Sequence, residues 1–437
     1  MFPHDATASH VARSYPATNA APDTTLIRDV RVFDGTTALD ANSVLVRNGL
    51  IAEAGTDLPE PNCAEVVKGD GGTLLPGLID AHTHTMRPAE LRQALAFGVT
   101  TELDMFCVPS LLDPLREAAA TRNDVADIRS AGVGATAAGG HPTQLVETGV
   151  YPPFPTLDHR DDAAAFVTDR SGEGSEFVKI LIEDGSAMGW NEMARLTPET
   201  ITALVAASHA HQLRAVAHIS TQEDARQAVT AGIDGMAHLF VDEPADPGFA
   251  RQAAEAGIFA TPTLTIFEQL HENHRRDVHY RDHPRLWPYL DPEMRAALLA
   301  DWRNYVSWQP PRWASAQHVA HATRTLHEAG VPILAGTDVA TPRAAHGLSL
   351  HSELAALVDA GLSPTEALAA ATSAPAKAFA LTDRGRIKPG LRADLLLVAG
   401  DPTRDITAST EIAGIWLRGH RFDREAYRAD LDPDNAG

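Results

Sequence analysis

Apolar positions along this chain gather in short runs that are separated by segments with helical spacing. The runs Val178–Ile182 and Val331–Ala335 are almost continuously apolar, as in parallel strands that are buried on both faces. Between such runs, Ile201–His209 has helical periodicity, with Thr197 as a candidate N-cap before it. The pattern therefore predicts parallel strands that alternate with helices. Strand-like runs occupy Leu74–His84, Val99–Phe106, Asp127–Ala135, Phe177–Glu183, Arg214–Ser220, Gly235–Phe240, Ile258–Ile266 and Val331–Val339.

Four helix-like segments end in a glycine that directly precedes a β-branched residue. Glycine adopts the left-handed C-cap conformation that other residues resist, and a β-branched residue favours the start of a strand. This repeated joint and the eight strand-like runs predict an α/β fold, a (β/α)8 TIM barrel from about residue 76 to 382. The joints are Ala96-Phe97-Gly98-Val99, Thr230-Ala231-Gly232-Ile233, Glu255-Ala256-Gly257-Ile258 and Glu328-Ala329-Gly330-Val331.

The segments on either side of the predicted barrel alternate apolar and polar residues. Each flank is too short to close a core of its own, so we expect residues 24–75 and 383–430 to pair into one small β-sandwich domain. Residues 1–23 are expected to form a flexible leader, and residues 268–315 an insertion that acts as a lid or a dimer contact. The alternating runs are Thr25–Phe33, Ser43–Arg47, Leu50–Ala54, Ala393–Val398 and Ile412–Leu417, with Asn48-Gly49 as a hairpin turn signal.

Charge and cysteine content narrow the class of protein. The 437 residues include 36 Lys and Arg against 58 Asp and Glu, a formal net charge of −22, which argues against nucleic acid or an anionic membrane as a partner. Cys63 and Cys107 are the only cysteines, which excludes a cysteine-rich metal cluster and fits a reducing compartment. No apolar stretch approaches the roughly 20 residues that span a bilayer. We therefore expect a soluble cytoplasmic protein that acts on a small molecule and forms a homo-oligomer.

Two histidines follow the first barrel strand with one residue between them. Side chains at i and i+2 of a strand point to the same face, so His82 and His84 can direct their imidazoles at one point. Converging neutral imidazoles form half of a transition-metal site. A pair of surface histidines at a strand end is the alternative.

Further ligand types stand at the ends of later strands. Chemistry in barrels of this kind lies at the carboxyl ends of the strands, where Lys179, His218, His238 and Asp338 fall. Each has an ordinary structural alternative, since a histidine can be a satisfied core residue and an aspartate can cap a turn. With His82 and His84 they give six candidate ligands at one rim.

Lys179 lies in an otherwise apolar strand, where burial penalises its charge and lowers the amine pKa. A buried ion pair with Glu183 or Asp184 is the structural alternative. In the functional interpretation the neutral amine takes up carbon dioxide, and the resulting carbamate bridges two divalent ions about 3.5–4 Å apart that hold a hydroxide. Asp338 would then bind one ion and carry the proton.

These residues resemble the binuclear pattern of the amidohydrolase superfamily. The resemblance is carried by Pro76-Gly77-Leu78-Ile79-Asp80-Ala81-His82-Thr83-His84, the lysine strand, Ala217-His218, Ala237-His238 and Gly336-Thr337-Asp338, and covers roughly residues 25–420. It implies that His82, His84 and Asp338 hold the more buried ion, that His218 and His238 hold the exposed one, and that carboxylated Lys179 bridges them. It also implies two divalent ions, with zinc as the expected metal.

The residues after His218 indicate a branch within the superfamily. Members that deaminate nucleobases or open imidazolone rings with one metal usually carry His-x-x-Glu on the fifth strand, whereas here His218 is followed by Ile219-Ser220-Thr221. The chain looks most like the branch of Xaa-Pro dipeptidases and carbamate or arylamide hydrolases, with imidazolonepropionase-like proteins as related members. Gly139-Gly140-His141 resembles that branch's substrate-side histidine.

The substrate side of the predicted site is less constrained. His141 would polarise the scissile carbonyl or bind a substrate carboxylate, with a loop-stabilising role as the alternative. Gln144, Tyr151 and Arg343 are further candidates for substrate contact. His346 or Glu353 would orient the loop after the eighth strand, unless this segment only caps the following helix.

Taken together, these residues predict a hydrolase of C–N acyl bonds in amide, dipeptide-like, N-acyl or carbamate substrates. An ester, lactone or phosphoester hydrolase on the same binuclear site is the alternative. A non-catalytic scaffold is the third possibility, and metal analysis would distinguish it.

Overall fold

The computed structural model describes residues 24–190, 192–272, 276, 280, 283–299, 311–339 and 344–431. The predicted leader 1–23 and Arg343 lie outside these residues, as does part of the predicted insertion 268–315. None of the helices within the described ranges is long and apolar enough to cross a bilayer. Both cysteines are free, with Cys63 exposed and Cys107 buried.

Two parallel sheets and three bridges between them form the central ring. One sheet has the order β6-β7-β8 and the other β12-β11-β10-β9. Parallel bridges join Ala135 to Ile180, Ala260 to Ile333, and Thr83 to Val339, so the segment 331–339 closes the ring as its eighth member. This arrangement agrees with the predicted (β/α)8 barrel. The strands are β6 (Leu78–Thr83), β7 (Val99–Asp104), β8 (Asp127–Ser130), β9 (Phe177–Leu181), β10 (Arg214–His218), β11 (Gly235–Ala237) and β12 (Phe259–Thr261).

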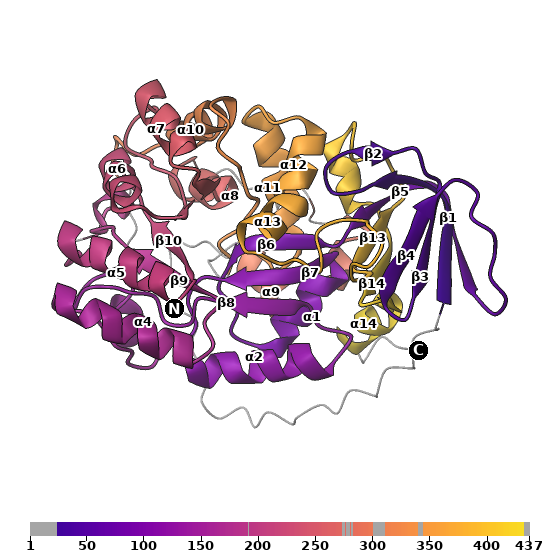
Figure 1. Cartoon of the computed structure of the whole chain (residues 1–437), viewed down its shortest axis with the longest axis horizontal. Coiled ribbons are helices and arrows are strands. Elements are labelled where there is room, and N and C mark those ends of the chain that lie inside the picture. The colour runs from indigo at the N-terminus through magenta and orange to yellow at the C-terminus, as the bar shows by residue number, and fades with distance from the viewer. Residues whose placement is uncertain are drawn as a thin grey trace.

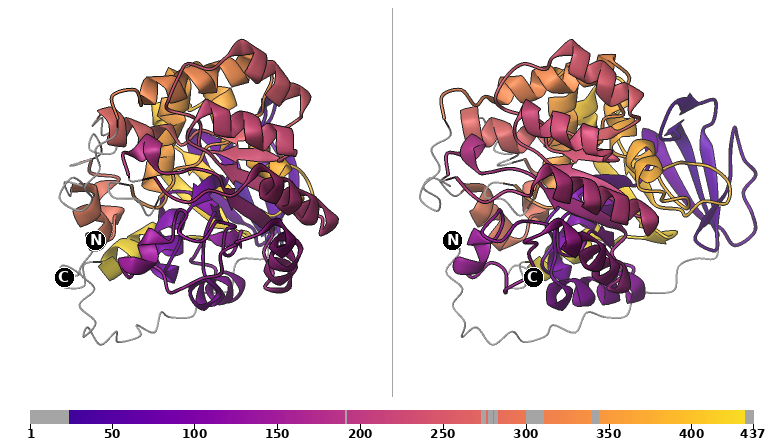
Figure 2. Two further views of the ribbon diagram at one scale, coloured as in Figure 1. Left: turned by 90° about the vertical axis from the view of Figure 1, so that its left-hand side faces the viewer. Right: turned by 60° about the vertical axis from the view of Figure 1, so that its left-hand side comes forward.

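Helices surround this ring and connect its strands (Figure 1, Figure 2). Thr197 and Thr221 cap α5 and α6 with their side chains, and Gly232 ends α6 in the left-handed conformation, as the sequence pattern predicts. The principal helices are α1 (Pro88–Ala96), α2 (Pro109–Thr121), α4 (Ala163–Gly172), α5 (Pro198–Ala210), α6 (Gln222–Ala231), α7 (Pro247–Glu255), α10 (Ala316–Glu328), α11 (Leu348–Asp359) and α14 (Arg424–Leu431). Shorter helices are α3 (Gln144–Glu147), α8 (Leu264–Phe267), α9 (Pro292–Leu299), α12 (Pro364–Ala370) and α13 (Ser373–Ala378).

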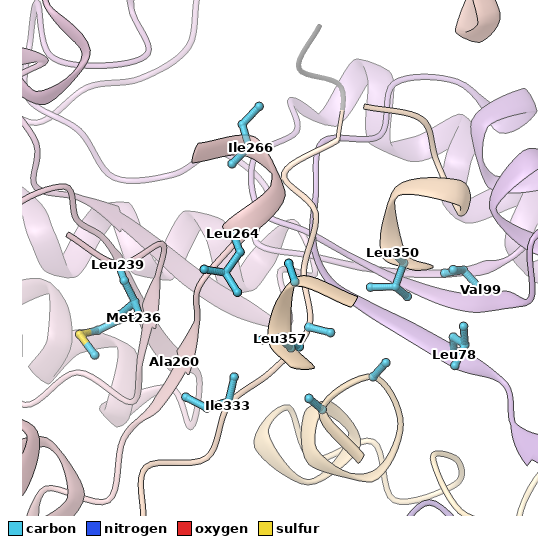
Figure 3. Close-up of a cluster of buried hydrophobic side chains, with 14 of the residues drawn as sticks. Leu78, Val99, Met236, Leu239, Ala260, Leu264, Ile266, Ile333, Leu350 and Leu357 are labelled. Atoms are coloured by element: carbon cyan, nitrogen blue, oxygen red, sulfur yellow. The ribbon is translucent and has the colours of Figure 1, made fainter. Parts of the chain in front are cut away.

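The apolar face of α11 helps to bury the outside of the ring. Leu350 and Leu357 belong to the same buried cluster as Leu78, Val99 and Ile333, which come from both ends of the barrel sequence (Figure 3). Burial of each such leucine or isoleucine contributes about 1.5–3 kcal/mol. This packing holds the first and last strands together, and those strands carry the inner part of the candidate site.

The two flanks of the chain meet in a second sheet beside the barrel (Figure 1). The predicted pairing of the flanks is confirmed, because β5 bonds to β1 in parallel and to β13 antiparallel. The strands nevertheless form one connected sheet, of order β15-β14-β13-β5-β1-β3-β4 with β2 on β1, rather than two separate sheets. They are β1 (Thr24–Phe33), β2 (Ala38–Leu39), β3 (Ser43–Arg47), β4 (Leu50–Gly55), β5 (Glu65–Pro76), β13 (Leu395–Val398), β14 (Ile412–Leu417) and β15 (His420–Arg421).

The expected first strand Leu74–His84 is divided at Gly77. Leu74, Leu75 and the terminal Pro76 belong to β5 in the flanking sheet, and Leu78 begins β6 in the barrel. A Cβ atom at Gly77 would lie 2.4 Å from the Thr100 side chain, so only glycine allows the chain to pass this close to β7. The prediction of one continuous strand was wrong, because a close approach of this kind leaves no mark in the hydrophobic pattern.

Candidate metal centre

Three ligand-type side chains converge where β6 and the eighth segment end. Asp338 Oδ1 lies 3.3 Å from His82 Nε2 and 3.2 Å from His84 Nε2. Tetrahedral coordination with bonds of 2.0–2.1 Å separates neighbouring ligand atoms by about 3.3 Å. We call His82, His84 and Asp338 the inner trio. Their spacing is that of a metal-ligand set.

Backbone geometry fixes the inner trio. Asp338 has a φ of +56°, a left-handed conformation that is rare for a residue other than glycine, and its N–H donates to the carbonyl of His82. Asp80 Oδ1 accepts hydrogen bonds from the N–H groups of His82 and Thr337, and its Oδ2 accepts from the Thr337 hydroxyl. Asp80 therefore ties the two ligand-bearing segments together. The sequence analysis assigned it no such role.

Electrostatics leave His82 and Asp338 in the protonation states that bind cations. Burial and the nearby Lys179 lower the pKa of His82 to about 3, so its imidazole is neutral at pH 7. Burial alone would raise the pKa of Asp338, but His82 and His238 hold it well below its usual range. A neutral imidazole and an ionised carboxylate are the forms that coordinate a divalent ion.

A second set of three lies at the ends of the next strands. Glu183 Oε1 lies 3.1 Å from His218 Nε2 and 3.8 Å from His141 Nε2. The carboxylate is buried, with 1% of its side chain exposed. We call His141, Glu183 and His218 the outer trio, since all their ligand atoms lie within 4.8 Å of one another. The sequence analysis considered Glu183 only as an ion-pair partner of Lys179.

His238 and Lys179 lie next to the two trios. The His238 ring centroid is 4.5 Å from that of His82 and 4.6 Å from that of His218. Lys179 Nζ is 3.5 Å from His82 Nε2, and burial lowers the pKa of this amine to about 7. All six predicted ligands therefore gather at one rim, as expected from their strand-end positions.

A hydroxyl group fixes the tautomer of His238. The Thr263 hydroxyl donates to the carbonyl of Pro262 at 2.8 Å and lies 2.7 Å from His238 Nδ1. Since its proton is used for Pro262, the Thr263 oxygen accepts from Nδ1–H of His238. Nε2 of His238 then carries the lone pair, as a metal ligand requires.

The residues present fit divalent metal ions. Four buried ligand-type atoms lack a hydrogen-bond partner among the described residues: His82 Nδ1, His84 Nδ1, His218 Nε2 and Glu183 Oε2. Buried polar atoms are ordinarily satisfied, so the unpaired His218 Nε2 and Glu183 Oε2 of the outer trio fit a site that binds a cation. Imidazole nitrogen and carboxylate oxygen suit zinc and similar ions.

A family model agrees with this geometry. The model described as "Amidohydrolase family" matches residues 73–421. The chain belongs to the amidohydrolase family. The match spans the barrel, every candidate ligand, and the returning strands of the flanking sheet.

Individual amidohydrolases resemble the chain at low identity. An imidazolonepropionase of Cereibacter sphaeroides (strain ATCC 17029 / ATH 2.4.9) is 27% identical over 386 residues, which cover 85% of this chain and 91% of that protein. A dihydroorotase of Pelobacter propionicus is 33% identical, but over 140 residues that cover 28% of this chain and 32% of that protein. The chain thus matches only about a third of the dihydroorotase and nearly all of the imidazolonepropionase.

Solved amidohydrolase structures share the fold. A Xaa-Pro dipeptidase with bound methionine has a TM-score of 0.72 and 19% identity, with 92% of this chain and 100% of the other covered. Phenylurea hydrolase B has a TM-score of 0.71 and 19% identity, with coverages of 92% and 97%. At this identity the likeness concerns the fold.

Two of the predicted substrate contacts have other partners in this amidohydrolase. Tyr151 is 5% exposed, its hydroxyl donates to the carbonyl of Phe106, and its ring packs against Phe106 and Phe154. Gln144 Nε2 lies 2.7 Å from His141 Nδ1, so Gln144 contacts a site histidine directly. Neither contact could be predicted from the sequence, and a role in substrate binding remains a prediction for both residues.

Of the two residues expected to orient the eighth-strand loop, Glu353 contacts a different loop. Glu353 accepts hydrogen bonds from the N–H groups of Leu264 and Thr265, each at 2.9 Å, and therefore holds the turn after β12. His346 is fully buried and lies 2.8 Å from Glu102, so it is not a surface helix cap. That expectation needs correction for Glu353, because the carboxylate on α11 reaches the seventh strand's loop.

Proposed function

We propose that this amidohydrolase is a binuclear metal-dependent hydrolase of C–N acyl bonds in amide, dipeptide-like, N-acyl or carbamate substrates. The observation that carries the proposal is the convergence of two ligand trios and of Lys179 and His238 at one barrel rim. Two divalent ions, with zinc as the expected metal, and a carbamate on Lys179 complete the proposed centre.

The likeness to other amidohydrolases supports the choice of bond. The similar structures include proteins named as a Xaa-Pro dipeptidase, a phenylurea hydrolase and a molinate hydrolase. A peptide and a urea both present a carbonyl carbon bonded to nitrogen. We propose that the present chain cleaves the same type of bond, and we assign it no individual substrate.

The chain's own residues supply positioning and proton transfer. Bound divalent ions would polarise the scissile carbonyl and acidify water. His82 and His84 hold the Asp338 carboxylate at the inner side of the site, where it takes a proton from water and passes it to the leaving nitrogen. Trp190 stacks on His141, with the two ring centroids 5.3 Å apart.

The test is a metal-dependence assay on matched substrates. Purified protein is freed of metal with a chelator, reconstituted with zinc and bicarbonate, and assayed on dipeptides, N-acyl amino acids, carbamates and anilides. We expect turnover of at least one C–N substrate class that is lost on chelation and restored by metal.

Ester forms of the same acyl groups, and a phosphoester substrate assayed separately, serve as the comparison. Preference for the ester form would favour the alternative ester or lactone hydrolase, since a metal-activated water attacks several electrophiles. A protein that binds no metal and turns over no substrate would contradict both proposals and favour the scaffold. The predicted cytoplasmic location and homo-oligomer remain predictions, and light scattering would test the latter.

A further inference from the structure

Glu183 stands outside the six ligands that the family resemblance implies, yet it occupies the centre of the outer trio. It follows β9 by two residues, and its side chain is 1% exposed. We infer that Glu183 is a ligand of the outer metal ion, together with His141 and His218. This inference rests on the proposed function in assuming a binuclear centre, and it gives the outer ion an anionic ligand other than the proposed carbamate.

Distances within the outer trio match those of the inner trio. The separations from Glu183 Oε1 are 3.1 Å to His218 Nε2 and 3.8 Å to His141 Nε2, which bracket the value of about 3.3 Å expected between ligands of a tetrahedral zinc ion. In the inner trio the corresponding separations are 3.3 and 3.2 Å. An ion could therefore bind to either set with small side-chain movements.

The burial of the Glu183 carboxylate also favours a cation in the outer trio. Glu183 Oε2 and His218 Nε2 are buried and have no hydrogen-bond partner within the described part of the chain. Glu183 Oε1 and His218 Nε2 face each other at 3.1 Å. A buried carboxylate is costly unless it is paired or coordinates a metal. A metal ion between these atoms would satisfy both.

Gln144 can set His141 in the tautomer that a metal ligand needs. A metal-binding Nε2 requires the proton on Nδ1 and an acceptor beside it. Gln144 Nε2 is placed 2.7 Å from His141 Nδ1, while its Oε1 is buried without a hydrogen-bond partner. Rotating the amide by half a turn exchanges these atoms and lets Oε1 accept from Nδ1–H. Gln144 would then accept a hydrogen bond from Nδ1–H of His141, as Thr263 does from Nδ1–H of His238.

The experiment measures metal binding rather than turnover. Metal-free protein is titrated with Zn²⁺ or Co²⁺ at saturating bicarbonate, so that the proposed carbamate is not limiting. Ions per chain are counted by mass spectrometry, and the visible spectrum of bound Co²⁺ reports the coordination. The Glu183→Gln variant keeps the shape of the side chain, and Asp184→Asn changes the adjacent carboxylate, which pairs with Arg195 at 3.7 Å instead.

We expect two ions in the wild-type and in Asp184→Asn. Glu183→Gln should bind the first ion normally and the second at least about tenfold more weakly, with a changed Co²⁺ spectrum. Gln144→Leu should weaken the second ion alone. Two ions of unchanged affinity and spectrum in Glu183→Gln would overturn the inference and leave Glu183 as a neighbour of the imidazoles.

Failure of the inference can be told from failure of the proposed function. If Glu183→Gln loses the second ion but the wild-type hydrolyses no C–N substrate, Glu183 is supported as a ligand and the proposed function is rejected. C–N hydrolysis together with two normally bound ions in Glu183→Gln would support the proposed function and reject Glu183 as a ligand. A wild-type protein that binds one ion would overturn the outer site. If Glu183→Gln does not fold, Glu183→Asp is used instead, because its shorter side chain keeps the charge but moves the carboxylate away from the imidazoles. Affinity for the second ion equal to that of the wild-type would then contradict the inference.

Discussion

His346 Nδ1 lies 2.8 Å from Glu102 Oε1, and both side chains are completely buried below the inner trio. Glu102 Oε2 in turn accepts a hydrogen bond from the hydroxyl of Thr85, which directly follows His84. Burial opposes the charge on His346, but Glu102 and Glu90 outweigh it and raise the pKa of this imidazole to about 9. His346 is therefore an imidazolium at neutral pH and stabilises the carboxylates under the site.

Glu102→Gln should destabilise the fold in a pH-dependent way. Because the folded pKa of His346 is above its unfolded value, its contribution is complete below about pH 6.5 and is lost as the pH rises through about 9. The free energy of unfolding of the wild-type should exceed that of the variant by on the order of 3 kcal/mol at pH 6, and this difference should be smaller at pH 10. Urea denaturation of metal-free protein across this range measures it.

Glu366→Gln is the control for that experiment. Glu366 lies 3.3 Å from His327, and half of its side chain is exposed. Removing its charge should therefore lower the free energy of unfolding by less than about 1 kcal/mol. A difference between wild-type and Glu102→Gln that stays constant from pH 6 to 10 would mean that His346 is neutral in the folded protein.

Thr263→Ala should weaken metal binding without touching a ligand. Removing the hydroxyl takes away the acceptor for His238 Nδ1–H and frees the ring to rotate or change tautomer. Loss of such a partner lowers metal affinity by about 10–100-fold. Thr263→Ser retains the hydroxyl and should bind metal like the wild-type in a competition titration with a chromogenic chelator. Equal weakening in both variants would point to the φ of +52° at this position rather than to the hydrogen bond.

The positions of the six candidate ligands at strand ends were predictable, because they follow from the order of residues along the chain. The apolar runs locate the strands, and His82, His84, Lys179, His218, His238 and Asp338 then fall at their carboxyl ends. Glu183 also had a signal, since residues i, i+2 and i+4 of a strand share a face and Glu183 is four residues after Lys179. That signal is weak where the strand ends at Leu181 and the chain changes direction.

Contacts between loops left no such signal. The pairing of Gln144 with His141 depends on the path of the chain after β8, and the reach of Glu353 to Leu264 and Thr265 depends on how α11 packs. The connected sheet of the flanks likewise depends on β5, whose Glu65–Pro76 sequence contains three glycines and reads poorly as a strand. These features are set by tertiary packing rather than by local pattern.

Gly336→Ala should destabilise the site because two strands meet there. A Cβ atom at this position would lie 2.6 Å from Thr261 Cγ2 and 2.8 Å from the backbone nitrogen of His82. The backbone of His82 cannot move away without displacing this proposed ligand, so we expect the free energy of unfolding to fall by about 1–3 kcal/mol and metal retention to weaken. Thermal melting and metal analysis measure these.

Gly172→Ala provides the matched control for Gly336→Ala. Gly172 is the last residue of α4, and a Cβ atom there would meet nothing within 4 Å. This change should leave metal retention unchanged and stability equal or slightly higher. A melting temperature for Gly336→Ala that matches that of Gly172→Ala would show that the Gly336 contact can relax.

Lys179→Met should abolish the bicarbonate dependence of the enzyme. We expect wild-type protein, freed of metal in buffer without carbon dioxide, to regain activity with zinc only after bicarbonate is added, and to show a carbamate signal by NMR with ¹³C-bicarbonate. The Met variant fills the same space without an amine and should show neither. Lys377→Met, at an exposed position, should behave like the wild-type. Full reactivation by zinc alone would refute the carbamate and leave Glu183 as the anionic ligand near the outer imidazoles.

Asp338→Asn should separate the proton-transfer role from metal binding and folding. The amide has the size of the carboxylate and can still face His82 and His84, but it cannot accept a proton from water. Proton transfer by a positioned group contributes about 10²–10⁴-fold to a rate, so we expect kcat to fall by at least that factor while the melting temperature and most of the bound metal are kept. Asp338→Ala should lose turnover as well, and Asp113→Asn, at an exposed position on α2, should lose nothing. Turnover in Asp338→Asn close to that of the wild-type would assign the proton to another group, and Glu183 would be the first carboxylate to test.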